Sequence, residues 1–583
     1  MASTLLLLTI GLPWLGALVV WRTGDEHSRM QHGLAVLFSV AAGIAALFMI
    51  PYGIQNLEFV IPVGGVFGDF TFAPDGLGVF LAAVATVVGS LAVIFSVDYM
   101  HGEHQLGRYY ALVLFFIGAM AGLVLTSSLL LMFVFWEITA LCSYALIAFH
   151  NDDPKAVAGG IKALIITQLG GIGLLVGALV LYVHTGTYDI NVVITNPDAL
   201  PIGALAWMGF GCLAAAAAKS AQFPFQTWLP DAMEAPTPIS ALIHAATMVN
   251  AGVYLLARFY PAFEGVAGWR EAVMVTGALS ALLAAIMAIV ASDLKRVLAY
   301  STVSQLGYMV YAVGAGGVFA SQFHLLSHSV FKALLFLGAG AVIHGVGTRD
   351  MRQMGGLGSK MPFVRTVFVI GALALAGLPV LNGFWSKELI LEAGLHHGNP
   401  IWLYAVMVLV AGLTAFYTFR MVWMVFYGQA RSAYHAHDAG GWMKTALAPL
   451  AFGTLTTWLL AGPFGVLLAE SLPAHHIEAH STLAVILEVV TAPATYLALG
   501  VVALGLAAWW RREQLVGARR ALAGLEKAAA DSFGFEAINR GVVKGTQNAA
   551  EFMRFTQPGL LNWNVFSILL GLIVLLVVLA LGG

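Results

Sequence analysis

Residues 203–230 read GALAWMGFGCLAAAAAKSAQFPFQTWLP, an apolar run that ends in a lysine and then breaks. The run approaches the length of about 20 apolar residues that a membrane-spanning helix needs. Lys219 stands inside it, where a charge costs about 2.5–3.5 kcal/mol on insertion scales. Pro224 interrupts helical hydrogen bonding shortly afterwards. The stretch therefore predicts a broken membrane span whose buried charge has a functional role.

The composition extends this prediction to the whole chain. Of 583 residues, 60% are apolar and 10% charged, whereas soluble proteins carry roughly 25% charged residues. We therefore expect an all-α polytopic membrane protein with about 16 transmembrane helices. Their approximate limits are 3–22, 33–51, 76–98, 109–127, 129–149, 160–183, 203–223, 238–259, 271–291, 296–314, 317–346, 363–395, 401–427, 445–469, 491–510 and 563–582.

The distribution of lysine and arginine predicts the orientation. With the N-terminus outside, the outer loops keep only Arg258 and Arg270, and the inner loops receive the many others. The positive-inside rule then places both termini on the outer side of a cell's inner (cytoplasmic) membrane. The first segment has neither a basic leader nor a small-residue cleavage site, so we expect a retained span.

Two broken segments predict the internal organisation. Span seven breaks at Pro224 and span twelve at Pro379, five spans apart, which is typical of two inverted five-helix repeats. Residues 52–75 alternate and carry Gly pairs, which indicates an outer hairpin. The charged, Ala-rich connector indicates an amphipathic lateral helix on the inner surface. The expected parts are the N-terminal spans and hairpin (1–108), first repeat (109–259), second repeat (271–427), C-terminal spans (428–510), lateral helix (511–556) and final span (557–583).

Redox and cofactor chemistry have no signature in the chain. Cys142 and Cys212 are isolated in apolar helices, and no C-x-x-C or strand-associated G-x-G-x-x-G occurs. We expect no cofactor, no metal and no self-contained catalytic chemistry. The net charge of −2 indicates no particular partner, and no nucleic acid is expected.

Ionisable side chains inside the spans predict a route for protons or small cations. His324, His328 and Lys332 stand at i, i+4 and i+8, so they share one helix face with steps near 6 Å. Two such histidines are also a zinc pattern, but no third ligand is apparent. The predicted route comprises Glu137, Lys219, His244, His324, His328, Lys332 and Lys387.

Other residues are expected to support this route. Glu388 offers an exit towards water or is only a surface charge, and the sequence leaves both open. Asp293 and Lys295 open span ten, where capping and orientation explain them as well as function does. The supporting set is Thr247, Asp293, Lys295, Glu388, Pro224 and Pro379.

Structural roles remain as alternatives for several of these side chains. Glu137 and Lys219 alone would make a structural ion pair, and His244 a hydrogen-bonded packing residue. Lys387 follows a helix break, so snorkelling to the inner surface is the alternative for it. Snorkelling is the preferred interpretation of Lys162 and Arg420, which lie near the inner ends of their spans.

Five motifs carry a family resemblance: FWEIT (135–139), DAMEAPTPISALIHAATMV (231–249), DLKRVLAYSTVSQLGYM (293–309), HLLSHSVFKALLFL (324–337) and GFWSKE (383–388). They resemble the antiporter-like subunits of respiratory complex I and of the multi-subunit Mrp cation/proton antiporters. The lateral helix and last span resemble the largest, distal-type subunit.

The resemblance implies a hydrophilic axis along the membrane midplane. Glu137 and Lys219 look like the family's charge pair, with Lys219 as the proton-carrying lysine of the first half. Gly171 stands where complex I subunits usually have an acidic residue, so it leans towards the Mrp large subunit, as does GTRDMR (347–352). Asn250 fits neither group's usual Thr or Lys.

We therefore expect a proton- or monovalent cation/proton-translocating subunit of a hetero-oligomeric membrane complex. Its partners would be other integral membrane subunits, the bilayer, and protons with sodium as the open alternative. Two alternative functions remain: a quinone-oxidoreductase (complex I-type) pump subunit, and a proton-conducting partner that energises an inorganic-carbon uptake enzyme. The retained route residues argue against a passive scaffold.

Overall fold

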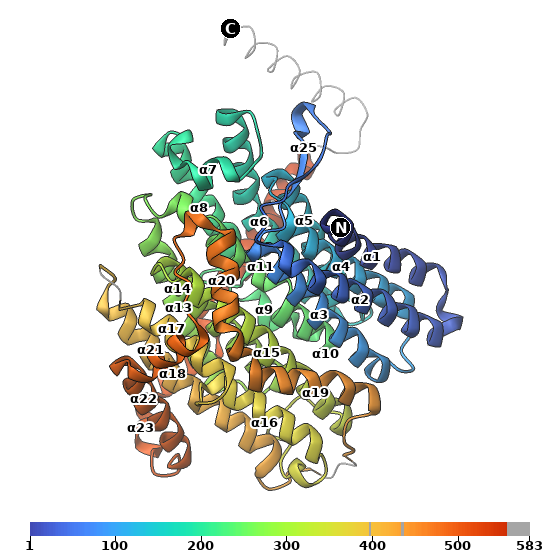
Figure 1. The fold of residues 1–583 in the computed structure, drawn as a ribbon. Helices are drawn as coiled ribbons and strands as arrows, with labels where there is room; N and C mark the ends of the chain where they lie inside the picture. Colours follow the sequence, from blue (N-terminus) through green and yellow to red (C-terminus); the bar gives the residue numbers. More distant parts are fainter. Residues whose placement is uncertain (396–397, 433–435, 557–583) are drawn as a thin grey trace. The chain divides into compact units, whose positions relative to one another are not determined.

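The computed structural model describes residues 1–395, 398–432 and 436–556, which form two units, Met1–Ala521 and Leu522–Gly583. The expected last span (563–582) lies outside the described residues. Unit 1 is built from helices, with one small hairpin (Figure 1). The predicted all-α membrane class is confirmed.

The helices of unit 1 follow the expected spans closely. Up to residue 263 they are α1 Ala2–Arg22, α2 Ser28–Met49, α3 Gly76–Tyr99, α4 Leu106–Leu125, α5 Leu129–Ile147, α6 Pro154–Thr185, α7 Asn191–Thr195, α8 Ile202–Lys219, α9 Trp228–Asp231, α10 Thr237–Ala241, α11 Met248–Arg258 and α12 Tyr260–Phe263. The rest are α13 Trp269–Val290, α14 Leu294–Gly314, α15 Val318–Val346, α16 Pro362–Ala376, α17 Asn382–Ala393, α18 Ile401–Val422, α19 Gly441–Thr456, α20 Ala461–Ser471, α21 Thr482–Thr491, α22 Pro493–Trp510 and α23 Val516–Ala521.

Thirteen helical segments of the described chain are long and apolar enough to cross a membrane, so the count of 16 is not confirmed. Span twelve is divided between the shorter α16 and α17. The helix α14 falls short because it carries buried Ser301, Thr302 and Gln305. A polar helix persists there because neighbouring helices, rather than lipid, surround it. The third missing span is the one at 563–582.

The hairpin predicted within 52–75 is present. Strands β1 (Phe59–Ile61) and β2 (Phe70–Phe72) pair antiparallel, with Val60 opposite Thr71. Residues 470–490, which lie between the expected spans 445–469 and 491–510, are partly helical. The helix α21 covers Thr482–Thr491, and Pro493, which cannot continue it, begins α22.

The two predicted helix breaks are present, and a third was missed. The helix α8 ends at Lys219, and Gly377–Leu381 separates α16 from α17. Span eight breaks as well: the π-helical turn η6 (Leu242–Ala246) joins α10 to α11, and Thr247 leaves helical geometry at φ −129°, ψ −107°. Half-helices leave backbone groups free inside a bundle, which is where ions can be handled.

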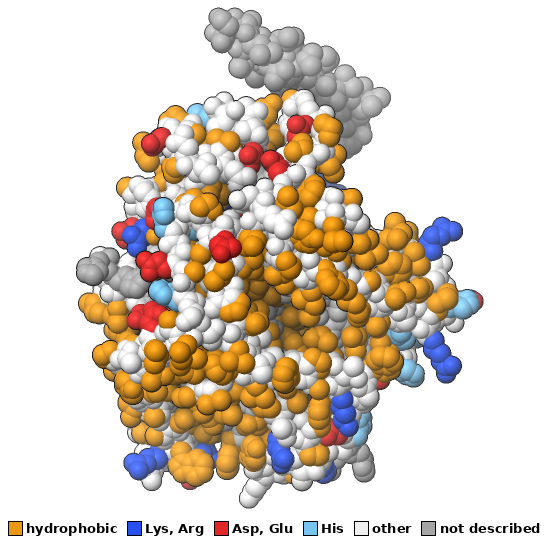
Figure 2. Space-filling model, viewed as in Figure 1, with side chains coloured by type: hydrophobic (Ala, Val, Ile, Leu, Met, Phe, Trp, Pro, Cys, Tyr) orange, Lys and Arg blue, Asp and Glu red, His pale blue; other side chains and the backbone are white. Residues whose placement is uncertain are grey.

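The centre of unit 1 is α15, which packs against α3, α14, α16, α17 and α19 (Figure 1). Next to it α13 and α14 approach closely where Gly277 meets Gly307; a Cβ on residue 277 would overlap the backbone of Tyr311. On the face shown in Figure 2, hydrophobic side chains form a broad band, with several Lys and Arg side chains along the lower edge. The band matches a membrane-embedded surface.

The connector after span fifteen is helical, as predicted, but it is not one helix. It contains α23, then in unit 2 α24 (Ala523–Ala530), η11 (Ser532–Gly534) and α25 (Phe535–Thr556). Phe533 and Gly534 take positive φ of 53° and 81°, which ends α24 before α25 begins. The placement of this connector along the inner membrane surface stays a prediction.

Candidate functional site

Lys219 ends α8 with its ammonium turned onto α5. The side chain is fully buried, and Nζ donates a hydrogen bond of 2.7 Å to the backbone oxygen of Trp136. The same nitrogen lies 4.9 Å from the centre of the Trp136 ring, a cation–π distance. Trp136 precedes Glu137, so the lysine reaches the turn that carries the carboxylate. Among the described residues, no ion pair within 4.0 Å joins Lys219 to Glu137.

Glu137 is half-buried and faces α6. Its Oε1 atom is enclosed without a hydrogen-bond partner in the described structure, and a Cβ on residue 171 would lie 2.5 Å from it. Glycine at 171 thus leaves the space that the carboxylate occupies. Gly171, where complex I subunits usually have an acidic residue, therefore lies directly against the Glu137 carboxylate.

Replacing Gly171 with Ala is therefore expected to displace Glu137 and to lower transport by about 10²-fold, the scale of a 1 Å misplacement. Proton flux in vesicles measures this. Gly177→Ala on the same helix is the control, because its Cβ would meet the flexible Met208 side chain at 3.3 Å and Cys212 Sγ at an ordinary contact distance of 3.9 Å. Equal transport by the two variants would contradict the placement of Glu137.

His244 lies in the π-helical turn of span eight, fully buried. Its ring is tilted by 36° against that of Phe336 of α15, with the centroids 4.7 Å apart, and neither ring nitrogen has a partner among the described groups. Thr247 Oγ1 donates 2.8 Å to the carbonyl of Leu242, and Asn250 Nδ2 donates 2.8 Å to that of Ala245. Thr247, predicted as a supporting residue, thus closes the turn that holds His244.

His324, His328 and Lys332 share one buried face of α15, as their spacing predicted. The two imidazole centroids are 6.4 Å apart. Polar side chains of α14 face them: Lys332 Nζ donates 2.7 Å to Ser301 Oγ, and His324 Nε2 lies 3.2 Å from Gln305 Oε1. The helix α14 is polar because it lines this face.

Lys387 lies on α17, which contacts the face of α15 that carries His324. His324 Nδ1 lies 2.9 Å from Oγ of Ser386, the neighbour of Lys387. Lys387 is 2% exposed and donates 2.9 Å to the carbonyl of Leu375, which the break after α16 leaves free. The lysine therefore does not snorkel. Glu388 is also buried, at 6% exposed, so it is no surface charge.

Several buried polar groups beside these residues lack protein partners in the described structure. Both nitrogens of His328, and both amide atoms of Gln226 and of Gln322, are among them. An unsatisfied buried polar group costs about 1–3 kcal/mol, so water is expected to satisfy them. Hydrated gaps between titratable groups are what proton transfer needs.

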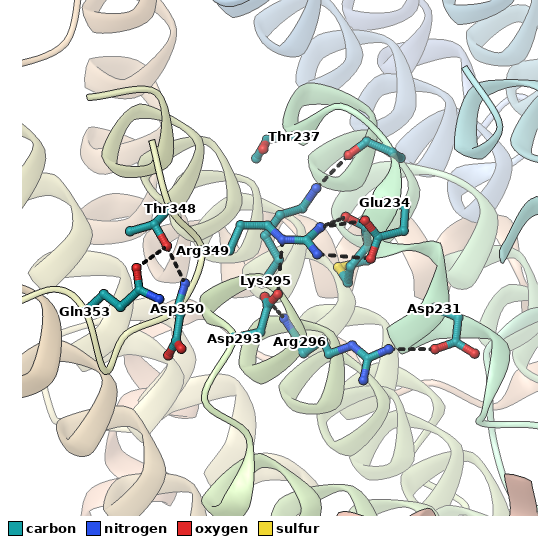
Figure 3. Close-up of polar contacts among 12 residues, drawn as sticks. Asp231, Glu234, Thr237, Asp293, Lys295, Arg296, Thr348, Arg349, Asp350 and Gln353 are labelled. Atoms are coloured by element: carbon teal, nitrogen blue, oxygen red, sulfur yellow. Dashed lines mark hydrogen bonds and ion pairs between the residues drawn. The ribbon is translucent and has the colours of Figure 1, made fainter. Parts of the chain in front are cut away.

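A network of ion pairs lies where three connectors meet at one end of the bundle (Figure 3). Asp231 pairs with Lys162 and with Arg296, each at 2.8 Å. Arg349 holds Glu234 through two hydrogen bonds of 3.0 Å. Lys162, which was expected to snorkel, reaches a part-exposed carboxylate of this network, and snorkelling stays a prediction.

Arg349 also ties Asp293 into this network. Its Nε lies 3.1 Å from Asp293 Oδ2, while Asp293 Oδ1 caps α14 at the N–H of Arg296 at 3.0 Å. Burial opposes the charge, but the hydrogen bonds that Arg349 donates to Glu234 and the negative charge of Asp293 raise the pKa of Arg349 above its ordinary value. Arg349 therefore stays charged, and the capping role of Asp293 is present.

Some residues of the site escaped sequence reasoning. Ser301, Gln305 and Ser386 touch the predicted groups, and polar residues inside spans were the available signal. Arg349 was noted only as part of a family motif. Pro224 and Pro379 lie at the breaks, as predicted. In the described part of the chain, no three His, Cys, Asp or Glu side chains form a metal-binding group.

Fold and site together define a polytopic membrane protein with buried titratable groups on broken helices. Residues 126–414 match the family described as "NADH:quinone oxidoreductase/Mrp antiporter, TM", and residues 60–110 match "NADH-Ubiquinone oxidoreductase (complex I), chain 5 N-terminus". The chain belongs to this family of proton-translocating membrane subunits, whose members work in multi-subunit complexes.

Two individual relatives are quinone oxidoreductase subunits. NAD(P)H-quinone oxidoreductase chain 5 of a Picosynechococcus strain is 43% identical over 72% of this chain and 67% of its own. NADH-quinone oxidoreductase subunit L of Pseudomonas aeruginosa is 39% identical over 80% and 78%.

Solved structures agree with this assignment. The Mrp complex of a Dietzia strain contains a chain with TM-score 0.84 and 28% identity, which covers all of this chain. This chain spans 63% of that subunit's length. A chain of an archaeal membrane-bound sulfane sulfur reductase has TM-score 0.71 and 25% identity, over 83% of this chain and 99% of its own.

Proposed function

We propose that protons move through this subunit along Glu137, Lys219, His244, the α15 face and Lys387. The single observation that carries the proposal is the bonded series across α14, α15 and α17: Lys332 on Ser301, and His324 between Gln305 and Ser386. Each group in it is fully buried and has a neighbour to which a proton can pass.

The arrangement of the two halves is part of this proposal. The first half (109–259) contributes Lys219 at the end of α8, and the second half (271–427) contributes Lys387 after the break beyond α16. In both, the lysine ammonium donates to a backbone carbonyl, that of Trp136 within α5 or that of Leu375 in the last turn of α16. We place the termini on the outer side, since this keeps the arginine-rich connectors inside.

The test is the replacement of Glu137 by Gln in the intact complex, with the pH gradient across vesicles as the measurement. Gln keeps the shape and removes the charge, so we expect transport to fall by about 10²-fold or more, as for loss of a proton-transfer group. Glu478→Gln, at a side chain 85% exposed, is the matched control. Full transport by Glu137→Gln would refute the route.

The driving complex is a second question. Two relatives are quinone oxidoreductase subunits, whereas Gly171, the residue that leans towards the Mrp large subunit, lies against the Glu137 carboxylate. We favour a cation/proton antiporter assembly because this glycine shapes the site itself. Co-purification decides: antiporter subunits would support this assignment, and quinone-reducing subunits would overturn it.

A further inference from the structure

We propose that Arg349 is a positioning residue for proton transfer: it holds two carboxylates away from buried Lys295, which then exchanges protons at the mouth of the route to His244. The inference rests on the proposed function, because Lys295 matters only if protons pass this way. Arg349 lies in the connector between α15 and α16, far along the chain from the α9–α10 connector that it binds.

Arg349 binds the carboxylates of both Glu234 and Asp293. Nη1 and Nη2 hold the two oxygens of Glu234 at 3.0 Å each, and Nε reaches Asp293 at 3.1 Å. A further bond of 3.0 Å from Nη1 goes to the backbone oxygen of Met233. Binding both carboxylates depends on the planar guanidinium group, whose N–H donors point in fixed directions. A lysine ammonium cannot reproduce this geometry.

Lys295 lies next to these contacts, and among the described residues no carboxylate forms an ion pair with it. It is 3% exposed, and Nζ donates 2.6 Å to the backbone oxygen of Ala235, the residue after Glu234. No ion pair within 4.0 Å is formed by Lys295 in the described structure. In Figure 3 the lysine points past Arg349 to that carbonyl. A buried ammonium normally has a paired carboxylate, so this lysine is kept as an exchangeable site.

Lys295 contacts the start of span eight, and His244 lies further along the same span. Ala235, the acceptor for Lys295, is joined to His244 by α10 and the start of η6, nine residues and roughly 13 Å at 1.5 Å per helical residue. The charged and titratable neighbours of Lys295 are Arg349 of the connector, Asp293 at the N-cap of α14, Glu234 of η5 and His244 of η6.

Losing Arg349 should free Glu234 and Asp293 to pair with the nearest remaining cation, Lys295. A carboxylate at contact distance favours the ammonium form. In Arg349→Gln we therefore expect the alkaline limb of the pH profile of transport to move up by about 1 unit, with a lower rate at neutral pH. Arg349→Lys keeps the charge but not the fork, so we expect a smaller shift in the same direction.

The experiment measures the pH profile of proton flux in vesicles that contain the intact complex. The double variant Arg349→Gln/Glu234→Gln removes a freed carboxylate and is expected to return the profile towards wild type. Arg352→Gln is the matched control in the same connector, because that side chain is 70% exposed and pairs only with Asp350 among the described residues.

Two results would overturn the inference. One is an Arg349→Gln profile at the wild-type position with only less complex in the membrane, which a purely structural clamp predicts. The other is a shifted profile that the double variant fails to move back. If the Arg349→Gln variant does not assemble, the pH profile of Arg349→Lys is compared with that of wild type in its place. Failure of the proposed function is seen separately, as proton flux that survives Lys219→Met.

Discussion

Replacing Lys219 with methionine is expected to reduce proton translocation by about 10²- to 10⁴-fold, the range for loss of a proton-transfer group. Methionine matches the length of lysine but cannot carry a proton. The fold should tolerate the change, since the Trp136 carbonyl that loses the ammonium still accepts a hydrogen bond of 2.7 Å from Thr139 Oγ1. The pH gradient formed by vesicles, normalised to the amount of complex, measures the effect.

Lys219→Arg separates a proton carrier from a structural charge. Arginine stays protonated at all physiological pH values, so it can replace lysine in an ion pair but not in a proton relay. We expect Lys219→Arg to assemble and to remain inactive. Lys155→Met, at an exposed lysine, is the control and should transport normally. Activity in Lys219→Arg would favour the structural ion pair and count against the relay.

The membrane spans could be read from the sequence because the bilayer leaves few choices. Long apolar runs must be helical there, since an unpaired backbone group in lipid is costly. The same argument places charges such as Lys332 on inward faces. It also explains why α14 is not apolar enough to count as a candidate span. Buried Ser301 and Gln305 lower its hydropathy, although the helix lies inside the bundle.

The broken helices were only partly predictable. Proline marks the breaks near Lys219 and Lys387, but no proline lies within η6, and the turn at His244 is held by Thr247 and Asn250 side chains. Such side-chain bonds to carbonyls depend on tertiary packing, which local propensity does not encode.

The ion pairs of the inner connectors were beyond sequence reasoning for a related reason. Glu234 and Arg349 are separated by more than a hundred residues, and the packing of α10, which follows Glu234, against α15, which precedes Arg349, brings them together. For the same reason the sequence predicted a Glu137–Lys219 pair, whereas the lysine bonds the neighbouring Trp136 carbonyl. Spacing along one helix, as for His324 and His328, is predictable; contacts between helices are not.

The largest stability effect is expected at the opposite end of the bundle from Arg349. Arg258 closes α11, is 2% exposed and pairs with Asp75, which also caps α3 at the N–H of Gly78 at 2.9 Å. Arg258→Ala leaves the largely buried carboxylate of Asp75 unpaired, and breaking such a pair costs about 3–5 kcal/mol. A fall in the thermal midpoint of the purified complex measures this loss.

The matched control for Arg258→Ala is Arg352→Ala, since Arg352 also pairs with an aspartate but is 70% exposed. Solvent screens that pair, so we expect little change in the midpoint. The double variant Arg258→Met/Asp75→Asn removes both charges together and should recover much of the loss, because desolvating the ions offsets most of their attraction. If Arg258→Ala and Arg352→Ala lower the midpoint equally, burial does not decide the strength of these pairs. A double variant no better than Arg258→Ala would instead show that the side chain acts through packing against its neighbours rather than through its charge.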